Sequence, residues 1–344
     1  MNRRQMLAVG AGALVSGTAW AQGPANPAPA DFAKAIEALA ATLEKNYVLP
    51  DVGARYAAML RTNARAGVYA PLNDAEQLAP RLTDDLQAVN RDGHLKVRPE
   101  GMMGGPGPRP RGGPNTGTAP PPRAMGVTPP PAITETKWLA PGVAFIGFNM
   151  FPGTEESVER VRFFMKEYTG ARALVIDART HRGGGLAEMD VMLPFLYAQR
   201  TELVAMDLRR TVYEERVLPF EADTLVEAPP PAGMYRRVHV VTPNSDTRWR
   251  GAKVFYLTAN RTVSAAEHLA LAFKRTKRAT LIGATTAGAN HFGGPEPIGA
   301  GLAVWLPVGR TSDPDTNWDW ETVGVAPDVA CDPAAAPEEA LKRA

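Results

Sequence analysis

Apolar residues recur at helical spacing in the first third of the chain. The spacing is clearest in residues 31–43, where four large apolar side chains fall on one helical face: Phe32, Ile36, Leu39 and Leu43. Residues 51–65 and 75–89 repeat this period. We therefore predict a small N-terminal domain of three helices over residues 31–98, whose last residues, 94–97, form a short strand.

A different alternation follows over residues 133–331. Apolar runs typical of buried strands occur at 143–148, 173–178, 253–258, 280–283 and 302–308, with extended runs at 203–216 and 237–241. Amphipathic stretches at 155–168, 187–198 and 265–273 lie between them, the second interrupted by Pro194. This order predicts an α/β (α+β) core over residues 133–331 and a C-terminal tail over residues 332–344. Residues 99–132 are rich in Gly and Pro, and we predict a disordered loop there.

The first thirty residues have a composition of their own. A basic start with Arg3 and Arg4 precedes an apolar stretch at 7–15 and the small-x-small sequence Ala19-Trp20-Ala21. This pattern predicts a signal peptide over residues 1–21, followed by a Pro/Ala linker over 22–30. The paired arginines are typical of the twin-arginine export route. We therefore expect a periplasmic or extracellular protein with no stable membrane span after cleavage.

Composition narrows the classes of partner and cofactor. Loss of Arg3 and Arg4 with the signal peptide lowers the formal net charge from +2 to zero, so nothing favours nucleic acid or anionic membranes as partners. The single cysteine, Cys331, excludes an internal disulfide. Residues 313–319 begin like a calcium loop, but Trp318 stands at the obligatory glycine and Gly324 at the closing glutamate. We expect no metal and no cofactor.

The chemistry of the chain centres on Ser264, where the run 253–258 turns into a helix. With Glu267, it fits the S-x-x-E capping box, in which the serine only closes a helix end. A hydroxyl at a helix entrance also has backbone N–H groups and the positive end of the helix dipole beside it, which suits a nucleophile and an anionic intermediate. Both interpretations stay open at this point. The glycine run 183–185 could bring further amides to the same place.

Four motifs occur in a fixed order, and together they resemble one protein family. They are Asp-Gly-His-Leu at 92–95, Val-Ile-Asp-Ala-Arg-Thr-His-Arg-Gly-Gly-Gly at 175–185, Val-Ser-Ala-Ala-Glu at 263–267 and Glu-Thr-Val-Gly-Val-Ala-Pro-Asp at 321–328. The set resembles the C-terminal processing (tail-specific) serine peptidases, within them the branch with the tricorn core protease and the interphotoreceptor retinoid-binding protein. The resemblance covers about residues 31–331. It implies a spiral β/α core like that of crotonase-like and ClpP-like enzymes over residues 133–331. The segment 99–132 is too short for the PDZ domain of many relatives.

The resemblance also implies roles for individual residues. Ser264 takes the place of the nucleophile, His94 of the general acid/base and Glu321 of the supporting carboxylate. The oxyanion would be bound by the amides of Ala265 and Gly184, with Gly183 or Gly185 as alternatives. A second branch of the family uses a lysine as base, but Ala289 stands at that position here. Gly93 is a departure, because tricorn-like enzymes have a serine just before the histidine.

These residues predict a secreted serine endopeptidase that cleaves peptides or unfolded proteins through an acyl-enzyme. The alternative is a non-catalytic binding protein for hydrophobic small ligands on the same scaffold, and a third option is hydrolysis of a small ester or lactone. His268 is the second choice of base, because it lies on the helical face of Ser264. We expect His181 and His291 beside the site and a structural role for His239. The sequence does not define the oligomeric state.

Overall fold

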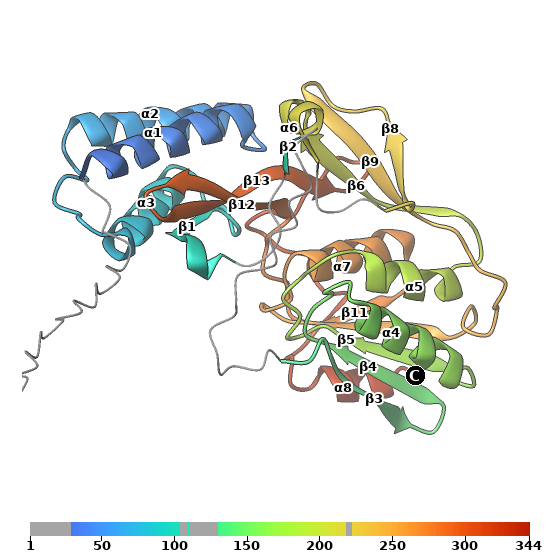
Figure 1. Ribbon diagram of the computed structural model, residues 1–344. Helices are drawn as coiled ribbons and strands as arrows, with labels where there is room; N and C mark the ends of the chain where they lie inside the picture. The colour runs from blue at the N-terminus through green and yellow to red at the C-terminus, as the bar shows by residue number, and fades with distance from the viewer. Residues whose placement is uncertain (1–28, 104–108, 111–129, 218–221) are drawn as a thin grey trace, which may run out of the picture.

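The computed structural model describes residues 29–103, 109–110, 130–217 and 222–344 (Figure 1). The predicted signal peptide, most of the linker and most of the Gly/Pro-rich segment lie outside these ranges, so those predictions stay predictions.

The N-terminal helices form as the apolar spacing predicts. They are α1 (Pro29–Asn46), α2 (Pro50–Arg65) and α3 (Ala75–Val89). Proline stands in the first turn of α2, where it gives up no hydrogen bond. The Asp74 side chain caps α3 by accepting the N–H of Gln77. The chain then passes residues 92–95 and enters β1 (Lys96–Pro99).

One six-stranded sheet forms the centre of the core. Its order is β14 (Val329–Ala330), β11 (Thr280–Gly283), β10 (Lys253–Thr258), β5 (Ala173–Asp177), β4 (Val143–Phe148) and β3 (Ile133–Ala140). Neighbouring strands are parallel except β3 and β4. Alternate residues enter different clusters: Ile176 packs under the helices α4 (Glu155–Glu167), α5 (Ala187–Leu196) and α7 (Ala265–Thr276), and Val175 packs towards α8 (Ala336–Leu341) (Figure 1). The sheet is therefore buried on both faces.

A second, antiparallel sheet connects this core to the N-terminal helices. Its order is β1, β13 (Leu302–Ser312), β6 (Thr201–Arg209), β9 (Met234–Val241) and β8 (Leu225–Ala228), and β12 (His291–Gly299) also pairs with β13. Apolar residues of α1, α2 and α3 share one buried cluster with β1 and β13. The three helices therefore hold the 92–95 turn against this sheet. The remaining short elements are η1 (Glu100–Met102), α6 (Arg210–Glu215) and the paired strands β2 (Arg109–Pro110) and β7 (Arg216–Val217).

The predicted fold class is confirmed: the protein is mixed α/β, with a small N-terminal helical region and a sheet core. Two local predictions were wrong. The extended run 203–216 contains the helix α6, and Pro194 lies within α5 rather than interrupting it. The domain boundaries stay predictions. Among the helices that the structure describes, none has the length and apolar character required to cross a membrane.

Candidate active site

Ser264 lies at the entrance of α7 in a backbone conformation that most residues avoid. Its φ is +60°, in the positive region where L-residues other than Asn and Asp are rare. Hydrogen bonds to the N–H and to the carbonyl oxygen of Ser264 hold this conformation. The Ser264 N–H donates to Glu267 Oε2 at 2.8 Å, and its carbonyl oxygen accepts the N–H of His268 at 3.0 Å. The carboxylate half of the capping box is therefore present, and it fixes the strained backbone under the hydroxyl.

The Glu267 carboxylate is a buried junction between α7 and the following loop. Its Oε1 accepts from Thr286 Oγ1 at 2.6 Å and Gly288 N–H at 2.7 Å, and its Oε2 also accepts from Ala289 N–H at 3.0 Å. Burial raises the pKa of Glu267, and these hydrogen bonds oppose that shift. The S-x-x-E spacing predicted that Glu267 takes part in a helix cap, but it did not predict the bonds of Glu267 to the following loop.

The glycine run lies directly against the serine. A Cβ added to Gly183 would stand 2.7 Å from Ser264 Cβ and 3.1 Å from its Oγ, so only glycine allows this approach. The run is pinned by Phe151, whose N–H donates to Gly183 O and whose carbonyl oxygen accepts from Gly185 N–H. Between these bonds the Gly184 N–H is left without an acceptor among the described residues, as is the Ala265 N–H at the start of α7.

His181 supports the same glycine run from beneath. Its ring is fully buried against Phe151, and its Nδ1 accepts the N–H of Gly183 at 3.0 Å. Burial lowers the pKa of His181 to about 3, so the ring stays neutral and Nδ1 remains an acceptor at pH 7. His181 therefore lies beside the site, as expected, and it holds the glycine run in place.

His94 is placed by its backbone more than by its ring. Asp92 Oδ1 accepts the His94 N–H at 2.8 Å, and the ring stacks on Trp305 with centroids 6.5 Å apart. Its Nδ1 is buried without a hydrogen-bond partner, and no hydrogen bond joins the ring to Ser264 or Glu321 in the described part of the chain. Burial lowers the pKa of His94 to about 4, against an opposing effect of Asp92, so the imidazole is neutral at pH 7.

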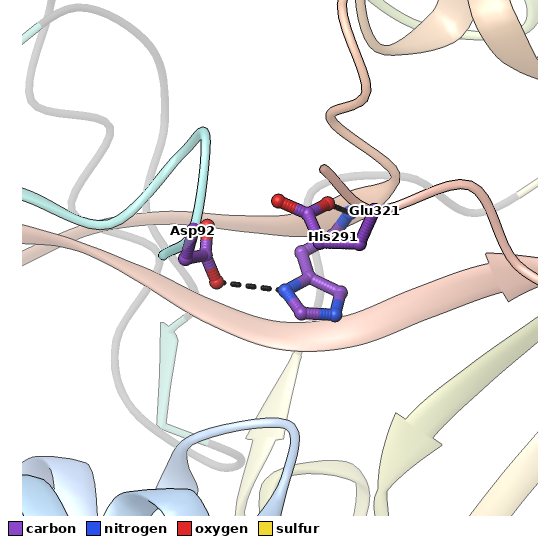
Figure 2. A group of neighbouring side chains, drawn as sticks. All are labelled: Asp92, His291 and Glu321. Atoms are coloured by element: carbon purple, nitrogen blue, oxygen red, sulfur yellow. Dashed lines mark hydrogen bonds and ion pairs between the residues drawn. The ribbon is translucent and has the colours of Figure 1, made fainter. Parts of the chain in front are cut away.

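Glu321 holds the turn that precedes the imidazole. Its Oε1 accepts the N–H of Gly93 at 2.9 Å, and its Oε2 accepts the N–H of Asn290 at 2.7 Å. Oε2 also accepts the N–H of His291 at 3.2 Å (Figure 2). Burial raises the pKa of Glu321, and His291 acts in the opposite direction. The structure therefore brings Glu321 to the backbone next to His94 and not to its ring.

Asp92 and His291 form a buried pair beside this turn. His291 Nδ1 lies 2.7 Å from Asp92 Oδ2 (Figure 2). The same oxygen also accepts the hydroxyl of Tyr47 at 2.7 Å. Burial opposes the charge of Asp92, yet the bonds from His291 and Tyr47 outweigh it and hold the pKa of Asp92 at about 2. Burial likewise opposes protonation of His291, but Asp92 raises its pKa above the usual value. The sequence contained Asp92 in a motif without giving it a role.

Asp92, His291 and Glu321 also have the composition of a metal site. One ligand atom of each lies within 4.8 Å of the others. However, all four carboxylate oxygens already accept N–H or O–H groups, and His291 Nδ1 is bound to Asp92. The cluster is therefore satisfied as a hydrogen-bond network and does not fit a cation without breaking it.

The second choice of base, His268, is engaged elsewhere. Its Nε2 lies 2.9 Å from His239 Nδ1, and His239 Nε2 lies 2.9 Å from Asp190 Oδ1. His268 is thus part of a buried group of bonded side chains with His239 and Asp190, and the choice of His94 as the base stays a prediction.

Comparisons with known proteins identify the family of the chain. Residues 142–331 match peptidase family S41, and residues 30–123 match the N-terminal domain of that family in eukaryotic interphotoreceptor retinoid-binding protein. A structure from Parabacteroides merdae described as a candidate peptidase is 16% identical, with a TM-score of 0.53 and coverage of 92% of this chain and 93% of that one. The tricorn protease is 13% identical, with a TM-score of 0.52 and coverage of 92% and 35%.

The photosystem II D1 C-terminal processing protease is 21% identical, with a TM-score of 0.42, and the match covers 56% of this chain and 42% of that one. This chain thus spans less than half of the length of the D1 protease and of the tricorn protease. At these identities, the two matches with a TM-score above 0.5 support the fold alone. The family match covers more than half of the 344 residues. The chain therefore belongs to peptidase family S41 and is by family a serine peptidase.

Proposed function

We propose that the protein is an endopeptidase of the tail-specific type that cleaves peptide bonds through an acyl-enzyme on Ser264. The observation that carries the proposal is the strained backbone of Ser264, with two unpaired amides nearby in sequence and space, those of Ala265 and Gly184. A serine that only capped a helix would have no need of a φ of +60°. Strain of this kind is typical of a nucleophile presented on a strand-to-helix turn.

In the acylation step, neutral His94 accepts the proton of Ser264 Oγ, and Oγ attacks the carbonyl carbon of the peptide. The carbonyl oxygen becomes an oxyanion, which the amides of Ala265 and Gly184 bind, each contributing about 3 kcal/mol to lowering the barrier. The C–N bond then breaks, and the leaving amine takes the proton from His94. A water molecule attacks the resulting ester and gives a proton to His94. The ester C–O bond then breaks, the acid product leaves, and His94 returns the proton to Ser264 Oγ.

Asp92 and Glu321 act on the base through its backbone. Asp92 accepts the N–H of His94, and Glu321 accepts the N–H of Gly93, so the two carboxylates fix the turn that carries the imidazole. Catalytic hydrogen bonds are often long before substrate binds and shorten in the complex. We propose that the His94 ring reaches Ser264 Oγ in that way when a peptide fills the site.

The proposal includes the place of the protein and its substrates. The basic start, apolar stretch and small-x-small sequence of residues 1–21 support export, by the twin-arginine route, to the periplasm or beyond it. Substrates there would be peptides or unfolded segments. The alternative of a binder for hydrophobic ligands has no specific observation in its favour: the cavity between α5, β8 and β9 and the cavity between α3 and β1 both include charged side chains.

Labelling with a fluorophosphonate tests the nucleophile. We expect the native protein to be labelled, Ser264→Ala to be unlabelled, and Ser245→Ala, which removes an exposed serine, to behave as the native protein. Equal labelling of native protein and Ser264→Ala would remove Ser264 from the mechanism. Mass spectrometry of an unfolded protein incubated with each form then separates a peptidase, which releases peptides, from an esterase, which leaves the chain intact.

A further inference from the structure

A cavity of about 240 Å³ lies away from the residues of the proposed active site, where α5 meets the strands β8 and β9. Its apolar wall is formed by Leu193, Val226 and Val241, and its polar residues include Asp190 and His239. Pockets for drug-sized ligands measure about 300–1,000 Å³, so this one suits a smaller compound.

Hydrogen-bonded side chains connect this cavity to His268 of α7, the helix that follows Ser264. Asp190 Oδ1 lies 2.9 Å from His239 Nε2, His239 Nδ1 lies 2.9 Å from His268 Nε2, and the N–H of His268 donates to Ser264 O at 3.0 Å. Both imidazoles are buried, whereas the Asp190 side chain is 21% exposed. The cavity end of the chain is therefore the accessible one.

The charge of Asp190 determines the arrangement of protons along the chain. A carboxylate only accepts, so His239 carries its proton on Nε2 and its Nδ1 becomes an acceptor. His268 must then donate from Nε2. Any ligand that alters the hydrogen bond of Asp190 changes the proton preference of His239, and through it the bond to His268.

The cavity also offers polar groups that have no partner. Arg200 and Asp223 line it, are exposed and make no ion pair with any described residue, and Thr224 Oγ1 is buried without a hydrogen bond. Two carboxylates, Asp190 and Asp223, face a single guanidinium. The excess of negative charge favours a cation, and the apolar wall favours a hydrocarbon group on it.

We propose that this cavity binds a small organic ammonium compound with an apolar side chain, of the size of one amino acid or the first residue of a peptide. The ammonium pairs with Asp190 and Asp223, and the apolar group packs on Leu193 and Val226. We further infer that binding is transmitted along His239 and His268 to the helix of Ser264. This second step rests on the proposed function, whereas the binding site does not.

Calorimetry on the full chain tests the site. We expect L-leucinamide, a cation, to bind saturably and N-acetyl-L-leucine, an anion of similar size, not to bind. Asp190→Asn and Asp223→Asn should each weaken leucinamide binding about tenfold, because each removes one charged partner. Asp51→Asn, an exposed aspartate elsewhere, should bind as the native protein does. Absence of saturable binding below about 10 mM, or equal affinity in all three variants, would overturn the site.

Labelling by a fluorophosphonate tests the transmission. Saturating leucinamide should change the labelling rate of native protein at least about twofold, and the change should disappear in His239→Asn or, if that variant does not fold, in His268→Asn. Binding without any change in rate would overturn the transmission and leave the site standing. If Ser264 is never labelled, the proposed function fails, and the NMR signals of the His268 ring on leucinamide addition then decide whether binding reaches α7.

Discussion

The two halves of the proposed site differ in how fully hydrogen bonds hold their functional groups. On the nucleophile side, both oxygens of Glu267 are filled by four donors and the Ser264 backbone is bonded at its N–H and its carbonyl oxygen. On the base side, the turn before His94 is well bonded, but the ring has a buried Nδ1 without a partner and only Trp305 stacked near it. The proposed nucleophile is therefore held by hydrogen bonds on its backbone, whereas the ring of the proposed base has none.

Sequence separation explains this difference. The hydrogen bonds of the Ser264 backbone and the Glu267 carboxylate stay within α7 and a loop about twenty residues later, as in the bond between Thr286 and Glu267, although the glycine run against Ser264 comes from further away. The base side joins Gly93 to Glu321 and Asp92 to His291 across 228 and 199 residues. The base is positioned only when the N-terminal helices dock on the second sheet.

The strongest test of the base side is His94→Ala. We expect kcat/KM to fall at least about 10³-fold, because His94 is the general base of the proposed mechanism. The unfolding midpoint should change by only a few degrees, since the ring makes no hydrogen bond. Arg91→Ala, an exposed neighbour in the same turn, should keep native activity. A His94→Ala enzyme with more than a tenth of native kcat/KM would contradict the assignment.

The corresponding test of the nucleophile side is Glu267→Gln. An amide has one accepting oxygen where the carboxylate has two, so two of the four donors would face an NH₂ group. We expect a loss of about 2–4 kcal/mol in the free energy of unfolding and a fall in kcat of about 10²-fold, measured by denaturant titration and peptide cleavage.

Glu338→Gln makes the same chemical change at an exposed position and serves as the control. We expect its unfolding free energy to stay within about 0.5 kcal/mol of native. If Glu267→Gln matched that control, the buried carboxylate would not be what holds the strained serine, and the contrast between the two halves of the site would disappear.

The sequence predicted local elements on both sides of the proposed site but few of the contacts between them. Helical period gave α1, α2 and α3, and strand–turn–helix order placed Ser264 at the entrance of α7. These are local patterns, and local patterns survive in a single sequence. β12 was missed, because its glycines and prolines disfavour strands and only pairing with β13 stabilises it.

The roles of Asp92 and Glu321 could not be read from spacing. Besides its two local bonds, Asp92 binds Tyr47 and His291, which lie 45 and 199 residues away and meet it only in the folded protein. The resemblance suggested that Glu321 supports the histidine, but not that it would bind the backbone of Gly93. Such bonds depend on docking between distant elements, which no periodicity encodes.

The protonation of His94 gives a smaller test of the same contrast. Its pKa is about 4, below the ordinary value of 6.5, so the folded protein binds fewer protons than the unfolded chain between these pH values. The stability that His94 contributes is thus present above pH 6.5 and is lost as pH falls towards 4. We expect the ring to titrate near pH 4 by NMR, with the signal assigned from His94→Ala. A midpoint near 6.5 would mean that the ring is solvated and the base side more open than the structure has it.

The smallest expected effect comes from placing a serine hydroxyl at position 93, where this chain has Gly93. The backbone of Gly93 does not have a positive φ, so a side chain is allowed there. A Cβ would lie 3.7 Å from Glu321 Oε1, within reach for a serine hydroxyl, but 2.9 Å from Ala289 Cβ, which is too close. The double variant Gly93→Ser with Ala289→Gly removes that clash. Its hydroxyl could bond Glu321 and lie beside the unpartnered Nδ1 of His94.

We expect this double variant to raise kcat about fivefold over its matched control, Gly93→Ala with Ala289→Gly, because one hydrogen bond contributes about 1 kcal/mol. The control carries the same Cβ and the same glycine and differs only in the hydroxyl, so any change in loop flexibility cancels between the two. Steady-state cleavage of one peptide by both variants gives the ratio. Equal kcat values would show that orientation of His94 does not limit the reaction, and the base side would then be as well organised as the nucleophile side once substrate is bound.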